Sequence, residues 1–99
     1  MEHEGLLFLY KGVIKGFSKY QANVSNSGLL QIIRKNQTIK IKIELRGIKV
    51  YPTIGKKSGF VLIKNKQKYW FRCVNENERI KWTTAINKFT QNLSMDAAV

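Results

Sequence analysis

A chain of 99 residues can build one hydrophobic core but has no room for two independent ones. Hydrophobic residues make up 43% of it, which argues against disorder over the whole length. Lys and Arg number 18 against 6 Asp and Glu, and the resulting charge of +12 predicts attraction to anionic lipid headgroups, nucleic acid or acidic proteins. No stretch approaches the roughly 20 apolar residues of a membrane span, and the acidic N-terminus is unlike a signal peptide, so we expect a cytoplasmic domain.

The positive charge is concentrated in the middle of the chain. Between Gly5 and Asn75 the only acidic residue is Glu44, against fifteen Lys or Arg. This imbalance exceeds what solubility requires. It favours a surface that faces anions over the simple solvation of strand edges and turns.

Residues that could carry catalysis or hold a metal are scarce. Cys73 is the single cysteine, which excludes an internal disulfide, and we expect it to be buried and inert. His3, the single histidine, falls in a terminus that we expect to be frayed, so neither a zinc site nor a Cys–His nucleophile pair is predicted. Helix capping explains Glu76 and Glu78 better than paired acid–base chemistry does. The sequence therefore predicts no enzyme, no metal site and no cofactor.

Short apolar runs separated by Gly, Asn and Ser turns predict seven β-strands. They lie at residues 4–11, 17–25, 29–34, 38–45, 48–51, 59–64 and 68–74. The first run is apolar on both faces, so the sequence leaves open which side points to the core. Pro52 follows the fifth strand and ends it, and a basic loop is expected at residues 54–58.

Two of these strands alternate clearly enough to show their core-facing side. Lys19 lies on the outward face of the second strand. The inward positions of that strand are Tyr20, Ala22 and Val24. The inward positions of the fourth strand are Ile39, Ile41, Ile43 and Leu45.

After residue 74 the hydrophobic period changes to that of a helix. Asn75 is a suitable N-cap, and Glu78 three residues later completes a capping-box pattern with Asn in place of Ser or Thr. We place the helix at residues 76–92, and its largest apolar residue, Trp82, is expected to plug one open end of the strand layers. The predicted fold is mainly β: seven antiparallel strands in two bent sheets, a barrel or sandwich capped by one C-terminal α-helix. A single domain is expected at residues 1–93, followed by a flexible tail at residues 94–99.

Two segments of the chain resemble a known family. The first reads Glu4-Gly5-Leu6-Leu7-Phe8, then Ile14-Lys15-Gly16-Phe17, then Ser25-Asn26 and Gly28-Leu29-Leu30. The second reads Tyr69-Trp70-Phe71-Arg72-Cys73, then Glu78-Arg79-Ile80-Lys81-Trp82-Thr83-Thr84-Ala85. Together they resemble a pleckstrin homology (PH) domain, in particular the PH domains of oxysterol-binding proteins and their lipid-transfer relatives. The resemblance extends from Glu4 to about Phe89.

The resemblance implies a seven-stranded, helix-capped barrel that binds phosphoinositides, often phosphatidylinositol 4-phosphate on Golgi-type membranes. It implies a module that is peripheral to the membrane and that targets a larger protein to it. In the oxysterol-binding subgroup, basic residues around the first loop bind phosphate and the apolar loop inserts into the bilayer. Lys40 falls where relatives carry a basic residue entering the fourth strand, and we expect Lys11, Lys15 and Lys19, around the first loop, to supply charge from shifted positions. The residues carried over as a membrane wedge are Tyr10, Val13 and Ile14.

Two positions depart from the family pattern and keep a second function open. Leu9 stands where the subgroup carries a lysine, and Tyr20 stands where the second strand carries an arginine. The alternative is therefore a PH-like module that binds a protein partner and has a degenerate phosphoinositide pocket; it would carry an exposed apolar patch away from the first loop. Nucleic acid binding is disfavoured, because Tyr69 and Phe71 share one face of a strand and should be core. The domain is expected to be part of a longer chain and to be a monomer, although the sequence leaves the oligomeric state open.

Overall fold

The computed structural model describes residues 2–53 and 57–98, with side chains as far as residue 90. Residues 54–56 of the predicted basic loop and the final residue of the predicted tail lie outside the described residues. Seven strands and one helix follow each other along the chain. They are β1 (His3–Tyr10), β2 (Phe17–Val24), β3 (Leu29–Ile33), β4 (Ile39–Glu44), β5 (Lys49–Pro52), β6 (Gly59–Lys64), β7 (Gln67–Arg72) and α1 (Glu76–Ala98).

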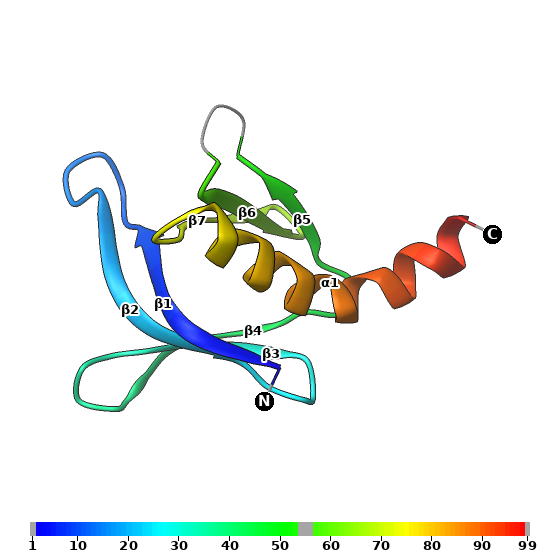
Figure 1. The fold of residues 1–99 in the computed structure, drawn as a ribbon, viewed down its shortest axis with the longest axis horizontal. Coiled ribbons are helices and arrows are strands. Elements are labelled where there is room, and N and C mark those ends of the chain that lie inside the picture. Colours follow the sequence, from blue (N-terminus) through cyan, green and yellow to red (C-terminus); the bar gives the residue numbers. More distant parts are fainter. Residues whose placement is uncertain (1, 54–56, 99) are drawn as a thin grey trace.

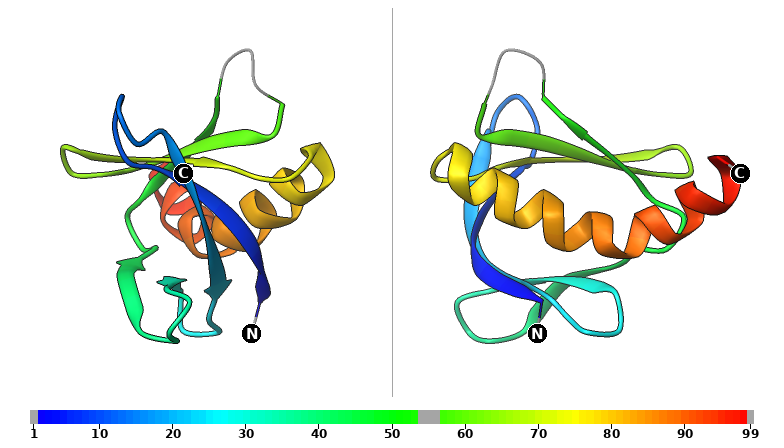
Figure 2. Two further views of the ribbon diagram at one scale, coloured as in Figure 1. Left: turned by 90° about the vertical axis from the view of Figure 1, so that its left-hand side faces the viewer. Right: turned by 45° about the vertical axis from the view of Figure 1, so that its right-hand side comes forward.

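All seven strands belong to one antiparallel sheet, in the order β4-β3-β2-β1-β7-β6-β5. The sheet bends sharply, so that β5–β7 form one layer and β1–β4 another, with α1 crossing the open side between them (Figures 1 and 2). The two predicted sheets are therefore two halves of a continuous one. β1 joins the halves, because it pairs with β2 along its whole length and with β7 near Phe8 and Leu9.

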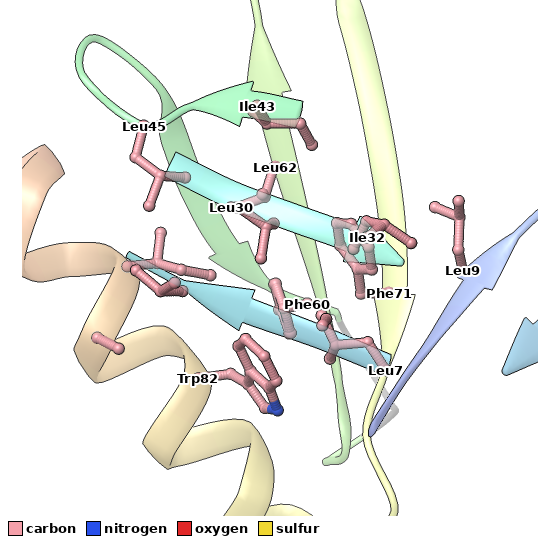
Figure 3. Close-up of a cluster of buried hydrophobic side chains, with 14 of the residues drawn as sticks. Leu7, Leu9, Leu30, Ile32, Ile43, Leu45, Phe60, Leu62, Phe71 and Trp82 are labelled. Carbon is pink, nitrogen blue, oxygen red and sulfur yellow. The ribbon is translucent and has the colours of Figure 1, made fainter. Parts of the chain in front are cut away.

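The core fills the space between the two layers and the helix (Figure 3). The side of β1 that the sequence left open is now assigned: Leu7 and Leu9 point inward and are buried. The inward face predicted for β2 is confirmed, since Ala22 and Val24 are fully buried and Tyr20 packs against the core.

One predicted core position in β4 is wrong. Ile39 is 43% exposed, whereas Ile43 and Leu45 further along are buried. The pairing of β3 with β4 shifts register between Ile32 and Ile33, opposite the start of β4. This bulge breaks the two-residue period, so the alternation that holds from Ile41 onward does not extend back to Ile39.

The helix begins as predicted, at an Asn N-cap. The side-chain oxygen of Asn75 accepts a hydrogen bond of 2.8 Å from the backbone N–H of Glu78. The Glu78 carboxylate lies 3.5 Å from the Nε2 atom of His3 and 3.4 Å from Nζ of Lys81. His3 is thus not in a frayed terminus: it lies in β1, with its ring edge-on to Trp82 at a centroid distance of 4.5 Å.

The other end of the helix differs from the prediction. α1 continues to Ala98 instead of ending near Asn92. The residues in between include neither Gly nor Pro, so nothing in this stretch stops a helix. The flexibility expected for residues 94–98 stays a prediction. Among the described residues, no helix has the length and hydropathy that crossing a bilayer requires.

Trp82 is fully buried, as predicted, and lies under the bent sheet beside Leu7 and Phe60 (Figure 3). Its indole N–H has no hydrogen-bond partner among the described residues, so its contribution comes from packing. Trp82→Ala should lower the free energy of unfolding by ~3–5 kcal/mol. Because each kcal/mol shifts the melting temperature of a domain this size by ~4–8 °C, thermal unfolding followed by circular dichroism measures the loss directly.

Trp82→Phe is the matched control for this prediction. It retains an aromatic ring and removes no hydrogen bond within the described residues, so it should cost much less than the Ala variant. A melting temperature of Trp82→Ala within a degree or two of the wild type would contradict the role of Trp82 as the anchor of α1.

Candidate functional site

Two lysines and a tyrosine meet at one end of the barrel. Tyr20 lies on the inward face of β2, Lys11 follows the last residue of β1, and Lys40 lies near the start of β4. The Lys11 ammonium donates a hydrogen bond of 2.8 Å to the Tyr20 hydroxyl. The Nζ atoms of Lys11 and Lys40 lie 5.5 and 5.7 Å from the centre of the Tyr20 ring. We call these three residues the Tyr20 cluster.

The strand pairing explains why these residues meet. Tyr20 continues the inward row of Ala22 and Val24 toward the end of the barrel, where the side chains are no longer fully covered. Lys11 extends the row of Leu7 and Leu9 past the end of β1. The loops that join β1 to β2 and β3 to β4 both lie on the side of the molecule away from the C-terminal end of α1 (Figure 1). The Tyr20 cluster lies at the bases of these two loops.

The Tyr20 cluster carries positive charge that perturbs the titration of its phenol. The hydrogen bond from Lys11 holds the pKa of the Tyr20 hydroxyl below its ordinary value; partial burial acts against this, and the charge of Lys40 adds to it. Within the described part of the chain, neither lysine has a carboxylate within ion-pair distance. Two ammonium groups therefore share one phenol and retain positive charge that an anion can neutralise.

The four lysines predicted to bind anionic lipid do not all come together. Lys11 and Lys40 join the Tyr20 cluster. Lys15 is exposed in the β1–β2 loop, and Lys19 points away from the cluster because it occupies the outward face of β2, opposite Phe8. Their lipid-binding role stays a prediction. Tyr20 is not one of the predicted site residues, although the sequence correctly predicts that it lies on the inward face of β2.

The loop between β1 and β2 is a compact turn with an apolar tip. Val13 is 93% exposed and Ile14 is 99% exposed, so neither is packed into the domain. Two backbone hydrogen bonds close the base of the turn, from Lys11 N–H to the Gly16 carbonyl (2.7 Å) and from Gly16 N–H to the Gly12 carbonyl (2.8 Å). Gly12 and Gly16 have φ angles of +108° and +61°, which favour glycine at these two positions. The turn therefore presents two exposed apolar side chains at its tip.

Tyr10, the third residue of the predicted wedge, lies apart from this tip. It ends β1 on the outward face of the sheet and packs on Phe17 at a ring-centroid distance of 5.3 Å. The two rings, with Trp70 and Arg72 of β7, line a pocket of about 310 Å³. The predicted wedge is thus divided between the loop tip and a second surface below it.

The groups that could support catalysis are arranged for structure. Cys73 is buried, as predicted, and burial raises the pKa of its thiol to about 12, which leaves it protonated and unreactive at neutral pH. Among the described residues, no three of the His, Cys, Asp and Glu side chains are grouped so that they could hold a metal ion.

A helix-capped, seven-stranded antiparallel barrel with a basic, loop-bounded end defines a binding module of the pleckstrin class. The family model for the PH domain matches residues 1–91, and the chain belongs to this family. PH domains are generally non-catalytic modules, commonly bind phosphoinositides, and typically associate with membranes peripherally. No curated protein is detectably similar to the chain in sequence.

Solved structures share this fold at low sequence identity. The PH domain of human oxysterol binding protein-related protein 11 is 19% identical, with a TM-score of 0.76 over 91% of this chain and 83% of that one. The C-terminal PH domain of pleckstrin in complex with D-myo-Ins(1,2,3,5,6)P5 is 18% identical, with a TM-score of 0.79 over 89% and 93%. The C-terminal PH domain of human pleckstrin 2 is 18% identical, with a TM-score of 0.78 over 89% and 81%. At these identities the likeness concerns the fold alone.

The Tyr20 cluster makes a prediction about titration. One of the four tyrosines should ionise at a lower pH than the others, because its phenolate would be stabilised by two ammonium groups. Ultraviolet difference absorbance of tyrosinate during a pH titration measures this. Tyr20→Phe should remove the early step, and Lys11→Met should move it to higher pH.

Tyr51→Phe is the control, because Tyr51 is exposed on β5 and its substitution removes one tyrosine chromophore, as Tyr20→Phe does. The early step should persist in that variant. An early step that survives in Tyr20→Phe, or that does not move in Lys11→Met, would contradict the arrangement of the Tyr20 cluster.

Proposed function

We propose that this domain attaches a larger protein to anionic, phosphoinositide-containing membranes through the β1–β2 loop. The observation that carries the proposal is the pairing of an exposed apolar tip, Val13 and Ile14, with the unneutralised positive charge of Lys11 and Lys40 at its base. The tip enters the interfacial region of the bilayer while the ammonium groups below it bind headgroup phosphates. Lys15, on the loop itself, adds to the attraction.

Approximate magnitudes support a reversible attachment. Each Lys near an anionic leaflet contributes about 1 kcal/mol, and this attraction falls off within a Debye length. Burial of Val13 and Ile14 in the bilayer adds roughly 2–4 kcal/mol. Together they give an attachment of the marginal, reversible strength that a single acyl chain provides. Salt should weaken it, because salt screens the electrostatic contribution.

The ligand class follows from the Tyr20 cluster. A monoester phosphate can accept hydrogen bonds from both ammonium groups and from the Tyr20 hydroxyl, which would replace the phosphate contacts of the arginine usual at that position. Phosphatidylinositol 4-phosphate, which the resemblance to oxysterol-binding proteins suggests, fits this description. Golgi-type membranes would then be the location of the protein. The alternative function, binding of a protein partner, is supported by the second surface, which lies beside Tyr10.

Vesicle sedimentation tests the role of the loop. We expect Val13→Ser/Ile14→Ser to reduce partitioning onto vesicles of phosphatidylcholine and phosphatidylserine by at least about tenfold, since apolar burial is lost. Val74→Ser/Ile80→Ser is the matched control, because Val74 and Ile80 are also exposed (56% and 47%) but lie outside this loop. Equal binding by the two double variants would contradict insertion of the tip.

Charge reversal tests the lysines separately. Lys11→Glu/Lys15→Glu/Lys40→Glu should reduce partitioning by about 100-fold or more at low salt, from the loss of about 1 kcal/mol for each lysine. Lys42→Glu/Arg46→Glu/Lys88→Glu changes the net charge equally at exposed positions outside the loop and should bind much better. If the two triple variants are equally weak, binding follows net charge alone and the proposed site is wrong.

The pKa of the Tyr20 hydroxyl can be used to measure headgroup binding at the Tyr20 cluster. Soluble inositol 1,4-bisphosphate should raise the pKa of Tyr20, because an anion held by Lys11 and Lys40 removes the stabilisation of the phenolate. Inorganic sulfate at equal ionic strength controls for screening. If the two anions move the titration equally, the Tyr20 cluster is an electrostatic anchor without headgroup specificity.

A further inference from the structure

A row of aromatic side chains crosses the outward face of the sheet below the β1–β2 loop. Tyr10 on β1 lies directly opposite Phe17 on β2, and Trp70 on β7 lies opposite Val61 on β6. Tyr51 on β5 extends the row, because it is paired with Val61 on the other side. Tyr10, Trp70 and Tyr51 are 38%, 39% and 47% exposed. Partly exposed aromatic side chains that share one face of a sheet form a candidate binding surface.

The middle of this row is hollow. A pocket of about 310 Å³ lies between β1, β7 and the ends of β5 and β6. We call it the Trp70 pocket; its lining residues are Tyr10, Phe17, Thr53, Gly59, Trp70, Phe71 and Arg72. Gly59 keeps it open, because it pairs with Arg72 and presents no side chain on this face. The Arg72 guanidinium lies 4.4 Å from the centre of the Phe17 ring, so its charge is held at the pocket wall.

The orientation of the strands limits what can bind on this face. β6 is paired with β5 and β7, and β1 and β7 pair with each other only at Phe8–Leu9 and Phe71–Arg72. The pocket lies on the outward face of these strands, which presents side chains and not backbone groups. A ligand must therefore be recognised by ring faces and by side-chain donors. The Tyr10 hydroxyl and the Trp70 indole N–H form no hydrogen bond with other described residues, and both are available to carbonyl oxygens.

These requirements favour a polyproline II segment. Its carbonyl groups make no internal hydrogen bonds, its proline rings stack on aromatic side chains, and it loses little conformational entropy on binding. An amphipathic helix needs a long apolar groove, whereas this pocket is near the lower end of the volumes that ligand sites have. The size suits one or two proline rings.

Charge adds a second requirement on the ligand. Arg72 has no carboxylate within ion-pair distance among the described residues, and the chain as a whole has a charge of +12. An acidic residue next to the prolines would form a charge-assisted hydrogen bond with the guanidinium. We propose that the Trp70 pocket binds a proline-rich segment of a partner protein that carries an acidic residue beside its prolines.

Nuclear magnetic resonance can test this on the intact chain. The chain has two tryptophans, so a ¹⁵N-labelled sample gives two indole signals, one from Trp70 and one from the buried Trp82. The probe is acetyl-Asp-Pro-Pro-Pro-Pro-Pro-amide; the comparison peptides replace all prolines by Ala, or the Asp by Lys. We expect the first peptide to shift the Trp70 signal and not that of Trp82, and the other two to bind at least about tenfold more weakly.

Variants separate the two parts of the recognition. Trp70→Ala should weaken binding of the acidic proline peptide by about tenfold or more. Arg72→Gln should weaken binding of that peptide but not of a peptide with Asn in place of Asp, because the substitution removes only the charge pair. Leu6→Ala is the matched control, since Leu6 is 40% exposed on the same face of β1 but does not line the pocket.

The outcomes decide the proposal independently of membrane binding. Equal shifts with the proline and alanine peptides would overturn the polyproline II ligand, and no loss in Arg72→Gln would overturn the acidic residue. If none of the peptides moves the Trp70 signal and phosphatidylcholine vesicles broaden it, the aromatic row is a membrane surface and the proposal is wrong. Trp70→Ala should leave the partitioning onto anionic vesicles unchanged, whereas Val13→Ser/Ile14→Ser, which changes no charge, should leave peptide binding unchanged.

Discussion

The position of β1 at the centre of the sheet is the constraint on which the rest of the structure depends. β1 pairs with β2 on one side and with β7 on the other, which fixes it in the wall of the barrel, and successive residues of a strand point to opposite faces. Leu7 and Leu9 complete the core, and Tyr10 points outward. Lys11, one residue later, reaches the open end and meets Tyr20. One strand thus supplies the core, the candidate phosphate site and the outer pocket.

Much of this fold could be predicted from local patterns, because each pattern was enforced by burial. The β2 alternation and the helical spacing around Trp82 hold in the structure because one face of each element is covered. The errors arise where this condition fails. At Ile39 a bulge interrupts the register, and His3 is held by Trp82 and Glu78, which lie far away in the sequence.

The candidate site could be predicted only in part. The resemblance to a family identified basic residues near the first loop, but it grouped Lys19 with Lys11 by proximity along the chain. The alternation of β2 already placed Lys19 and Tyr20 on opposite faces, and the structure agrees. Tyr20 stands where the family has an arginine, and in the structure its phenol contacts two lysines. The inward face of β2 and the family position together indicate Tyr20 as a site residue.

The two surfaces are near each other but need not compete. Tyr10 ends β1 on its outward face, and Lys11, the next residue, meets Tyr20 on the other side, so a phosphate at the Tyr20 cluster and a peptide at the Trp70 pocket contact different side chains. Their charges are nevertheless coupled. An acidic peptide on Arg72 offsets positive charge close to the loop, which weakens attraction to an anionic leaflet by at most about 1 kcal/mol for each charge neutralised. By thermodynamic reciprocity, a bound anionic membrane lowers the affinity for the acidic peptide by the same factor. In this way the partner's charge, and not only its shape, would influence whether the module is found on the membrane.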